Sequence, residues 1–202
     1  RDNVPISGPL LIAANHQSFL DPPLVGGSIR RHCTFIARSG LFKFGPFGLF
    51  IRSLNALPLK EEGGDAGAIK ETLRRLERGE AVVIFPEGSR CEDGAQHEFK
   101  RGVALLMKRA KCPVVPAAVE GCFDAWPIQR RFPRLLRQRV MVSYGTPIAP
   151  DELMKDGPDA ALARIAAEVD RLRLDLRAKL RAQTQGRLPS SGPGDTPASP
   201  QP

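Results

Sequence analysis

The chain has 202 residues, 42% of them hydrophobic, which is enough to bury the core of one domain and excludes global disorder. Its formal net charge of +8 points to anionic partners: phosphate groups, an acidic lipid surface, an acidic carrier protein or nucleic acid. The four cysteines lie far apart and the three histidines lack metal-ligand spacing, so we expect free thiols, a cytoplasmic setting and no metal.

Short apolar runs alternate with amphipathic stretches along the chain. Strands are expected at residues 10–14, 33–37, 54–59, 81–85, 113–119 and 140–144. The run from Ala81 to Phe85 is continuously apolar, which is typical of a strand buried on both faces of a parallel sheet. This alternation predicts an α/β fold: a single domain with a mainly parallel central sheet flanked by helices. Such sheets bind their ligands at the carboxyl ends of the strands.

Three helices are indicated by spacing. Ile69, Leu73 and Leu76 recur on one helical face, and residues 103–110 give a second, shorter one. The longest helix is expected at 158–182, where an apolar stripe faces a side rich in arginine. We interpret it as a helix docked on the core with a solvated basic face, in preference to a helix lying on a membrane surface.

Composition divides the chain into two parts. Residues 1–183 are expected to form the domain, and the stretch 184–202, rich in Pro, Gly and Ser, a disordered tail. No apolar run approaches the roughly 20 residues that a membrane-spanning helix needs, and no signal peptide is recognised. The sequence begins at Arg1 rather than Met, which leaves an upstream segment, and any anchor within it, open.

The segment Asn15–Asp21 follows the first expected strand. On a continuous helix His16 and Asp21 would face apart, but Pro22 and Pro23 favour a loop that ends in a helix start at Asp21. In that arrangement the carboxylate can fix the tautomer of the imidazole and stabilise the imidazolium, as a general base requires. Taken alone, the pair is better explained by a capping aspartate beside a loop histidine, because such pairs are common by chance.

A second cluster, Phe85–Arg90, follows the fourth expected strand. Gly88 lets the backbone approach a ligand closely, and Arg90 offers a planar fork for a phosphate or a carboxylate. Lys100 and Arg101 directly precede the second expected helix, and two cations at a helix N-terminus can form an anion site. Each segment alone is also explained by an ordinary turn with surface cations.

Together, Asn-His-x4-Asp and Phe-Pro-Glu-Gly-Ser-Arg at this separation resemble the glycerolipid, or lysophosphatidic acid, acyltransferases over roughly residues 8 to 150. The resemblance implies that His16 is the general base and that Asp21 supports it. It further implies that the acceptor's phosphate is bound by the stretch containing Glu87, Gly88, Ser89 and Arg90.

Two other assignments depend on the same resemblance. Leu54–Lys60 matches a family motif loosely: Lys60 replaces an arginine, keeps its charge and joins Lys100 and Arg101 as a candidate phosphate ligand. A Val-Pro stretch after a strand is a further family motif, from which Pro116 is expected to contact the acyl chain.

The segment 41–50 holds four of the ten phenylalanines and is interrupted by glycine and proline. Core packing and the lining of an acyl tunnel or contact with a bilayer are equally open for these rings. Phe42, Phe47 and Phe50 are the candidate acyl contacts.

The resemblance implies an acyltransferase that moves a fatty acyl chain from acyl-CoA or acyl carrier protein to a lysophospholipid hydroxyl. The expected acceptor is 1-acyl-sn-glycerol 3-phosphate, giving phosphatidic acid. We expect no cofactor, no metal and no nucleic-acid partner, and a peripheral position on an anionic membrane surface at the cytoplasmic face. A thioester hydrolase using the same residues on water stays open. A non-enzymatic binder of membranes or nucleic acid is disfavoured, because the cations are spread along the chain and only 6% of residues are aromatic.

Overall fold

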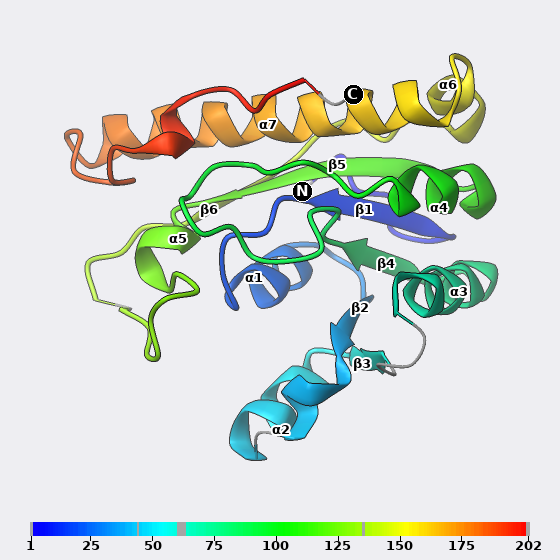
Figure 1. Ribbon diagram of the computed structural model, residues 1–202, viewed down its shortest axis with the longest axis horizontal. Helices are drawn as coiled ribbons and strands as arrows, with labels where there is room; N and C mark the ends of the chain where they lie inside the picture. Colours follow the sequence, from blue (N-terminus) through cyan, green and yellow to red (C-terminus); the bar gives the residue numbers. More distant parts are fainter. Residues whose placement is uncertain (1, 44, 60–63, 135, 201–202) are drawn as a thin grey trace.

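The computed structural model describes residues 2–43, 45–59, 64–134 and 136–200. Its central sheet has six strands in the order β3-β2-β4-β1-β5-β6, and all neighbours are parallel except β5 and β6 (Figure 1). The strands are β1 (Leu10–Ala14), β2 (Cys33–Arg38), β3 (Ala56–Leu59), β4 (Ala81–Ile84), β5 (Val114–Glu120) and β6 (Met141–Tyr144). The predicted single α/β domain with a mainly parallel sheet is confirmed, and each expected strand is present to within two residues at either end.

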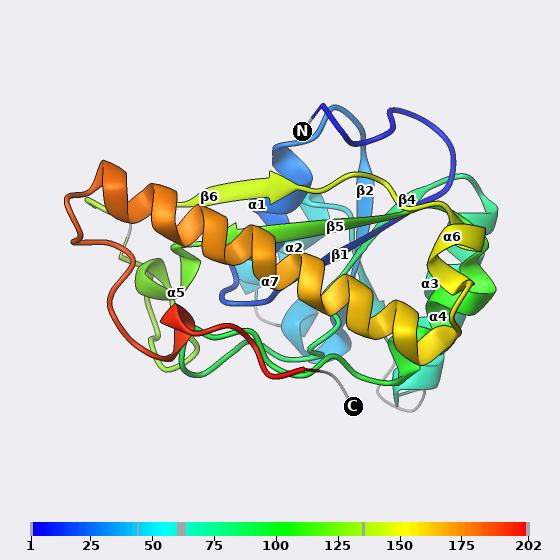
Figure 2. The same ribbon diagram turned by 90° about the horizontal axis from the view of Figure 1, so that it is seen from above.

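Helices cover both faces of the sheet. They are α1 (Asp21–Gly27), α2 (Gly45–Ser53), α3 (Gly64–Glu77), α4 (Gly102–Ala110), α5 (Cys122–Ala125), α6 (Pro150–Met154) and α7 (Pro158–Gln183), with 3-10 turns η1 (Ser39–Lys43) and η3 (Pro193–Asp195). Helices α3, α4 and α7 pack on one face and α1 on the other. Figure 2 shows α7 lying across the sheet. The three helices expected from spacing correspond to α3, α4 and α7.

Strand β1 lies at the centre of the core, and none of its five side chains is exposed. Leu11 and Ala13 pack beneath α4 and α7, whereas Leu10, Ile12 and Ala14 pack on the side of α1. Apolar residues are needed at every position because both faces of this strand are covered. The continuous apolar runs in the sequence follow directly from this arrangement.

The parallel pairing brings two polar loops together at one edge of the sheet. Strand β1 pairs with β4 from Leu10 opposite Ala81 to Ala13 opposite Ile84. Because parallel strands end at the same edge, the loop after β1 and the loop after β4 emerge side by side there. These loops carry both clusters recognised in the sequence.

The C-terminal segment departs from the expectation based on composition. Residues 184–200, predicted to be disordered, run back along α7, and Gly194 is buried (Figure 2). Arg173 and Arg177, expected on a solvated face of α7, are only 0% and 6% exposed. Asp195 and backbone carbonyls of the tail supply these arginines with hydrogen-bond partners. The composition of the tail shows only that it has few apolar residues. It does not show that the tail provides the hydrogen-bond acceptors that the buried arginines of α7 require.

The cysteines occupy core positions. All four are free and buried, in accordance with the expectation that they form no disulfide framework. Within the residues that the structure describes, no helix combines the length and the apolar character needed to cross a bilayer.

Candidate active site

The loop after β1 brings His16 and Asp21 into contact. His16 Nδ1 lies 2.8 Å from Asp21 Oδ2. A carboxylate can only accept a hydrogen bond, so Nδ1 carries the proton and Nε2 is left as the basic nitrogen. Asp21 is the first residue of α1, and Pro22 and Pro23 occupy the first helical positions after it, as the sequence predicted. The two side chains therefore meet although only five positions separate them.

Asp21 also fixes the backbone of this loop. Its Oδ2 accepts the N–H groups of Gln17 at 2.6 Å and Ser18 at 2.7 Å. The Ser18 hydroxyl in turn donates to the carbonyl of Trp126 at 2.8 Å. Asp21 is fully buried. Its Oδ2 accepts from both the loop backbone and the imidazole, so one carboxylate oxygen determines the course of the loop and the orientation of the ring.

The imidazole is supported from the loop after β4. Its ring stacks on Phe85 with centroids 4.1 Å apart and planes at 21°. The buried carboxylate of Glu87 accepts the backbone N–H of His16 at 2.7 Å and that of His97 at 3.1 Å. Burial raises the pKa of Glu87 to about 8, and the two N–H donors only partly oppose this. Glu87 thus holds the backbone of the loop that carries His16.

Arg90 offers a hydrogen-bond donor that no described residue accepts. Its guanidinium lies over the ring of Phe19, with Cζ 3.5 Å from the ring centroid. Nη1 is buried and has no hydrogen-bond partner among the described residues. Burial lowers the pKa of Arg90, and the charge of Asp21 acts in the opposite direction. Since leaving such a donor unpaired is costly, the geometry is suited to an anionic group supplied by a ligand.

His16 and Arg90 line one cavity of about 420 Å³, a volume typical of small-molecule sites. Its polar end is completed by Gly88, Ser89 and Lys100. The remainder is largely apolar and comes from β2, η1, α2, α3 and α4, with side chains that include Phe35, Ile36, Leu41, Ile51, Leu54, Ile69, Val103 and Leu106. The cavity therefore joins the His16–Asp21 pair, a cationic end and an apolar pocket.

Comparison with known proteins assigns the chain to a family. Residues 1–120, more than half of the chain, match the family model described as Acyltransferase. The chain belongs to the Acyltransferase family. The expectation drawn from the two sequence clusters is therefore confirmed at the level of the family.

The sequence of this chain is also similar to those of individual members of the family. The 1-acyl-sn-glycerol-3-phosphate acyltransferase of Bacillus subtilis (strain 168) is 30% identical over 122 residues, which make up 60% of this chain and 60% of that protein. The 1-acyl-sn-glycerol-3-phosphate acyltransferase alpha of Ovis aries is 30% identical over 164 residues, or 80% of this chain and 56% of that protein. This family member thus spans 60% and 56% of the length of these two relatives.

The fold is also shared with a solved structure of the family. The crystal structure of the 1-acyl-sn-glycerophosphate (LPA) acyltransferase PlsC from Thermotoga maritima matches with a TM-score of 0.70 and 25% identity. The match covers 88% of this chain and 70% of that chain.

The predicted phosphate ligands of this family member fall into two groups. Those that line the cavity are Gly88, Ser89, Arg90 and Lys100. Glu87 instead holds the backbone of His16 and His97, because its carboxylate lies beneath the loop. Arg101 is exposed at the start of α4 and does not line the cavity. Lys60 lies outside the described residues.

The predicted acyl contacts require correction. Phe42 lies in η1 beneath the guanidinium of Arg52, whose Cζ is 5.2 Å from the ring centroid, and does not line the cavity. Pro116 packs closely against Gly145 inside the sheet, on the side of α7, and is likewise absent from the lining. The Val-Pro stretch is therefore a core strand. The side chains of Phe47 and Phe50, on α2, lie outside the described part of the structure.

Two aromatic partners were not recognised from the sequence. Phe19 stacks with Arg90, and Phe85 stacks with His16. Both lie within the two sequence clusters, but a one-dimensional pattern does not show which rings face which side chains. The apolar lining from α3 was equally hidden, because Ile69 has the spacing of an ordinary core residue.

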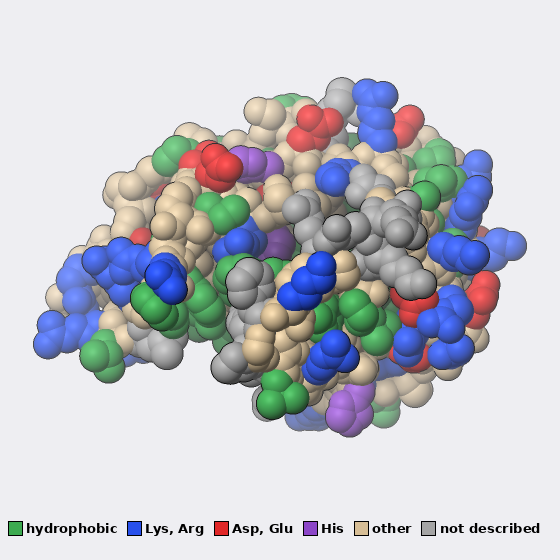
Figure 3. Space-filling model, turned by 60° about the horizontal axis from the view of Figure 1, so that its bottom comes forward, with side chains coloured by type: hydrophobic (Ala, Val, Ile, Leu, Met, Phe, Trp, Pro, Cys, Tyr) green, Lys and Arg blue, Asp and Glu red, His purple; other side chains and the backbone are tan. Residues whose placement is uncertain are grey.

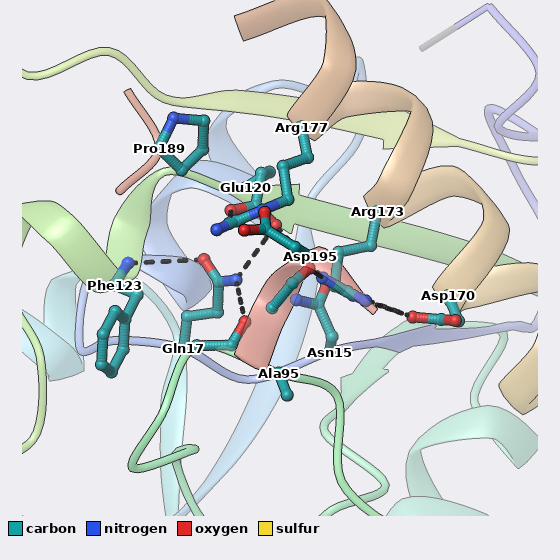
Figure 4. A network of polar contacts seen from close by, with 12 residues as sticks. Asn15, Gln17, Ala95, Glu120, Phe123, Asp170, Arg173, Arg177, Pro189 and Asp195 are labelled. Atoms are coloured by element: carbon teal, nitrogen blue, oxygen red, sulfur yellow. Dashed lines mark hydrogen bonds and ion pairs between the residues drawn. The ribbon is translucent and has the colours of Figure 1, made fainter. Parts of the chain in front are cut away.

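A buried polar network connects the loop of this family member to α7 (Figure 4). Gln17 Nε2 donates to Glu120 Oε2 at 3.2 Å, and Arg177 Nη1 donates to Glu120 Oε1 at 2.7 Å. Arg177 Nε also donates to Asp195 of the tail at 2.7 Å. The tail, α7, the end of β5 and the loop that carries His16 are therefore linked by consecutive hydrogen bonds.

Proposed function

We propose that this chain transfers a fatty acyl chain from a thioester donor to the free hydroxyl of 1-acyl-sn-glycerol 3-phosphate, giving phosphatidic acid. The observation that carries the proposal is a single cavity in which the His16–Asp21 pair, the unpartnered N–H of Arg90 and an apolar pocket meet. Membership of the Acyltransferase family and similarity to proteins named 1-acyl-sn-glycerol-3-phosphate acyltransferase support the choice of substrate.

In the proposed reaction His16 acts first as a base and then as an acid. Nε2 takes the proton of the acceptor hydroxyl while that oxygen attacks the thioester carbonyl, and a C–O bond forms. The tetrahedral intermediate collapses with cleavage of the C–S bond, and the imidazolium protonates the departing thiolate. Asp21 stabilises the imidazolium between the two steps. The products are an ester and a free thiol, so the scheme needs no cofactor.

Arg90 and Lys100 orient the acceptor in this proposal. Both lie at the polar end of the cavity with His16, so a phosphate held there presents a nearby glycerol hydroxyl to Nε2. Orientation of this kind lowers the barrier by roughly several kcal/mol. The donor is acyl-CoA or acyl carrier protein, and the apolar pocket accommodates an acyl chain. Because acceptor and product are membrane lipids, the protein works peripherally on an anionic membrane surface at the cytoplasmic face.

The test is an acyl-transfer assay with purified protein. Each donor is combined with 1-acyl-sn-glycerol 3-phosphate, glycerol 3-phosphate or an unphosphorylated acylglycerol, and both thiol release and lipid mass are followed. We expect thiol release to depend on the phosphorylated lysolipid and to yield phosphatidic acid. Thiol release without acceptor, accompanied by free fatty acid, identifies a thioester hydrolase instead.

His16→Ala supplies the matched test of mechanism. Losing a general base costs about 10²–10⁴-fold in rate, so transfer should fall by at least that factor while the thermal midpoint is maintained. His97→Ala is the control, because this exposed side chain pairs with Asp93 and does not line the cavity of the His16–Asp21 pair. Near wild-type turnover of the His16→Ala protein would refute the proposed mechanism.

A further inference from the structure

A basic loop with exposed hydrophobic side chains follows α5. We use the term basic loop for the described residues 127–134 and 136–139, which contain five arginines and no acidic residue. Within it, Phe132 is 70% exposed and Leu136 is 88% exposed. Basic and hydrophobic side chains lie next to one another on the left of the face seen in Figure 3, the side on which the segment after α5 lies in Figure 1.

The positive charge of the basic loop is not neutralised within the described part of the chain. None of its five arginines forms an ion pair with a described carboxylate, whereas the exposed Arg164 of α7 pairs with Glu152 at 2.5 Å. Arg131 instead lies over the ring of Phe132, with Cζ 5.5 Å from the centroid. Unpaired arginines beside exposed rings are typical of a surface that meets an anionic, partly apolar partner.

Hydrogen bonds and ring contacts hold the N-terminal end of the basic loop beside the candidate active site. Trp126 accepts a hydrogen bond from Ser18 at 2.8 Å, and its ring makes an edge contact with Phe19, with centroids 5.3 Å apart. Its indole Nε1 donates to the carbonyl of Arg130 at 3.0 Å. Ile128 contributes directly to the lining of the cavity. A partner bound to the basic loop is therefore next to the cavity.

Helix α2 offers a second exposed apolar point on the same side of the molecule. Its Leu49 is 72% exposed, while Ile51, two residues later, lines the cavity. Figure 1 shows α2 and the segment after α5 projecting from the same side of the sheet. Two separate apolar projections, each adjoining the cavity lining, suit contact with an extended surface.

We propose that the basic loop docks on an anionic phospholipid surface, with Phe132 and Leu136 among the headgroups and the arginines against lipid phosphates. The proposal rests on the proposed function, because docking brings a lysolipid of the bilayer to the cavity. A bilayer is favoured over an acidic protein because exposed apolar side chains occur both in the basic loop and on α2. An anionic bilayer can contact both projections at once, because its charged headgroups lie directly above its apolar acyl chains.

Co-sedimentation with vesicles tests the docking without requiring activity. Three double variants are compared with the wild type: Arg131→Glu/Arg137→Glu, Phe132→Ser/Leu136→Ser, and the control Lys108→Glu/Arg109→Glu. The control makes the same charge change on α4, which precedes β5, whereas the basic loop follows the other end of that strand. Each arginine near an anionic surface strengthens binding by about fivefold, so the loss of two arginines should weaken binding of the charge variant at least about 25-fold on phosphatidylcholine–phosphatidylglycerol vesicles. The control should change by less than about threefold.

Acyl transfer then separates docking from catalysis. With donor and acceptor in neutral detergent micelles, we expect both loop variants to keep wild-type rates, whereas transfer to vesicle-borne acceptor should fall. Equal losses of vesicle binding in the charge variant and in the control, or no binding by the wild type, would overturn the docking surface. Neither outcome bears on thiol release in micelles, which tests the proposed function. A charge variant that binds vesicles normally but loses transfer only from acyl carrier protein would assign the loop to that acidic protein instead and refute the lipid proposal.

Discussion

The carboxylate of Glu87 lies beneath the loop after β1 and accepts the backbone N–H of His16 at 2.7 Å. Asp21 sets the orientation of the imidazole ring, and Glu87 sets the position of the backbone that carries the ring. The two carboxylates come from different strand ends, so the sheet determines the distance between them. A residue that the family resemblance associates with the phosphate is thus, by its contacts, a positioning residue for the proposed base.

Replacement of Glu87 by Gln tests that role. Glutamine keeps the shape but presents an NH2 group to one of the two backbone N–H donors. We expect kcat to fall about tenfold, with KM for both substrates within about twofold, because the imidazole shifts while the cationic end of the cavity is unchanged. At pH 5, where the raised pKa keeps the Glu87 side chain neutral like glutamine, the free energy of unfolding should fall by about 1–3 kcal/mol, because the NH2 group cannot accept one of the two N–H bonds. Steady-state kinetics and urea denaturation measure the two effects.

Glu98→Gln is the control for this substitution, since Glu98 is exposed in the same loop. A large rise in KM for the phosphorylated acceptor at constant kcat would instead show that Glu87 contacts the substrate.

The raised pKa of Glu87 also predicts how stability depends on pH. Burial raises this pKa to about 8 from an ordinary value of 4.5, so the folded state binds the proton more tightly than the unfolded state. The stabilisation is complete below about pH 4.5 and is lost as pH rises towards 8. The free energy of unfolding should therefore decrease between pH 5 and pH 8, by up to about 1 kcal/mol per pH unit.

Urea denaturation across this pH range, with wild type and Glu87→Gln side by side, measures the contribution. Burial also raises the pKa of Glu120, which contributes with the same sign but is present in both proteins. Only the difference between the two slopes reports on Glu87, and parallel slopes would contradict the prediction.

The parts that could be predicted from sequence are those fixed by local rules. Continuous apolar runs gave the strands because β1 and β4 are covered on both faces, and two prolines fixed the helix start at Asp21 and hence its contact with His16. Long-range packing could not be predicted in this way. Pro116 was assigned to the cavity by a motif, yet the face of β5 on which it lies depends on α7.

Charge was the least predictable feature. Arg173 and Arg177 have the helical spacing of a solvated face, and their burial depends on a tail whose composition indicated disorder. Conversely, the buried unpaired Nη1 of Arg90 becomes visible only when every neighbouring acceptor is known.

Arg90 should be needed specifically for the phosphorylated acceptor. Arg90→Lys keeps the charge but loses the planar contact with Phe19 and the forked donors, so we expect KM for the acceptor to rise about tenfold. Arg90→Ala should raise it by about a hundredfold, since a charge-assisted hydrogen bond is lost as well. KM for the donor should change little in either variant. Arg101→Ala, an exposed cation outside the cavity, is the control, and an equal effect there would indicate nonspecific attraction.

Gly88 meets two requirements that alanine cannot meet. Its φ of +75° lies in the left-handed region, and a Cβ there would collide with Cε and Nζ of Lys100. We expect Gly88→Ala to lower the free energy of unfolding by about 1–2 kcal/mol and to raise KM for the acceptor, because Lys100 is displaced from the polar end of the cavity. In Gly27→Ala the added Cβ meets no atom within 4 Å, so it should leave both quantities nearly unchanged. Thermal denaturation and acceptor titrations measure the difference.

Asp195 tests whether the tail stabilises the active-site loop through α7. It accepts from Arg177 and from Arg181, each at 2.7 Å, and these hydrogen bonds lower the pKa of Asp195. Arg177 in turn donates to Glu120, which also accepts from Gln17. Asp195→Asn removes one of the two carboxylates that pair with Arg177, so we expect a loss of about 1 kcal/mol in the free energy of unfolding.

We also expect kcat to fall a few-fold at constant KM, because Gln17 adjoins His16 and shares the carboxylate of Asp21. Asp156→Asn, which alters an exposed pair with Lys155, provides the control for the loss of one surface charge. If the Asp195→Asn protein is destabilised but turns over at the wild-type rate, the tail stabilises α7 alone, and the hydrogen bonds from Arg177 through Glu120 to Gln17 do not extend its influence to the imidazole.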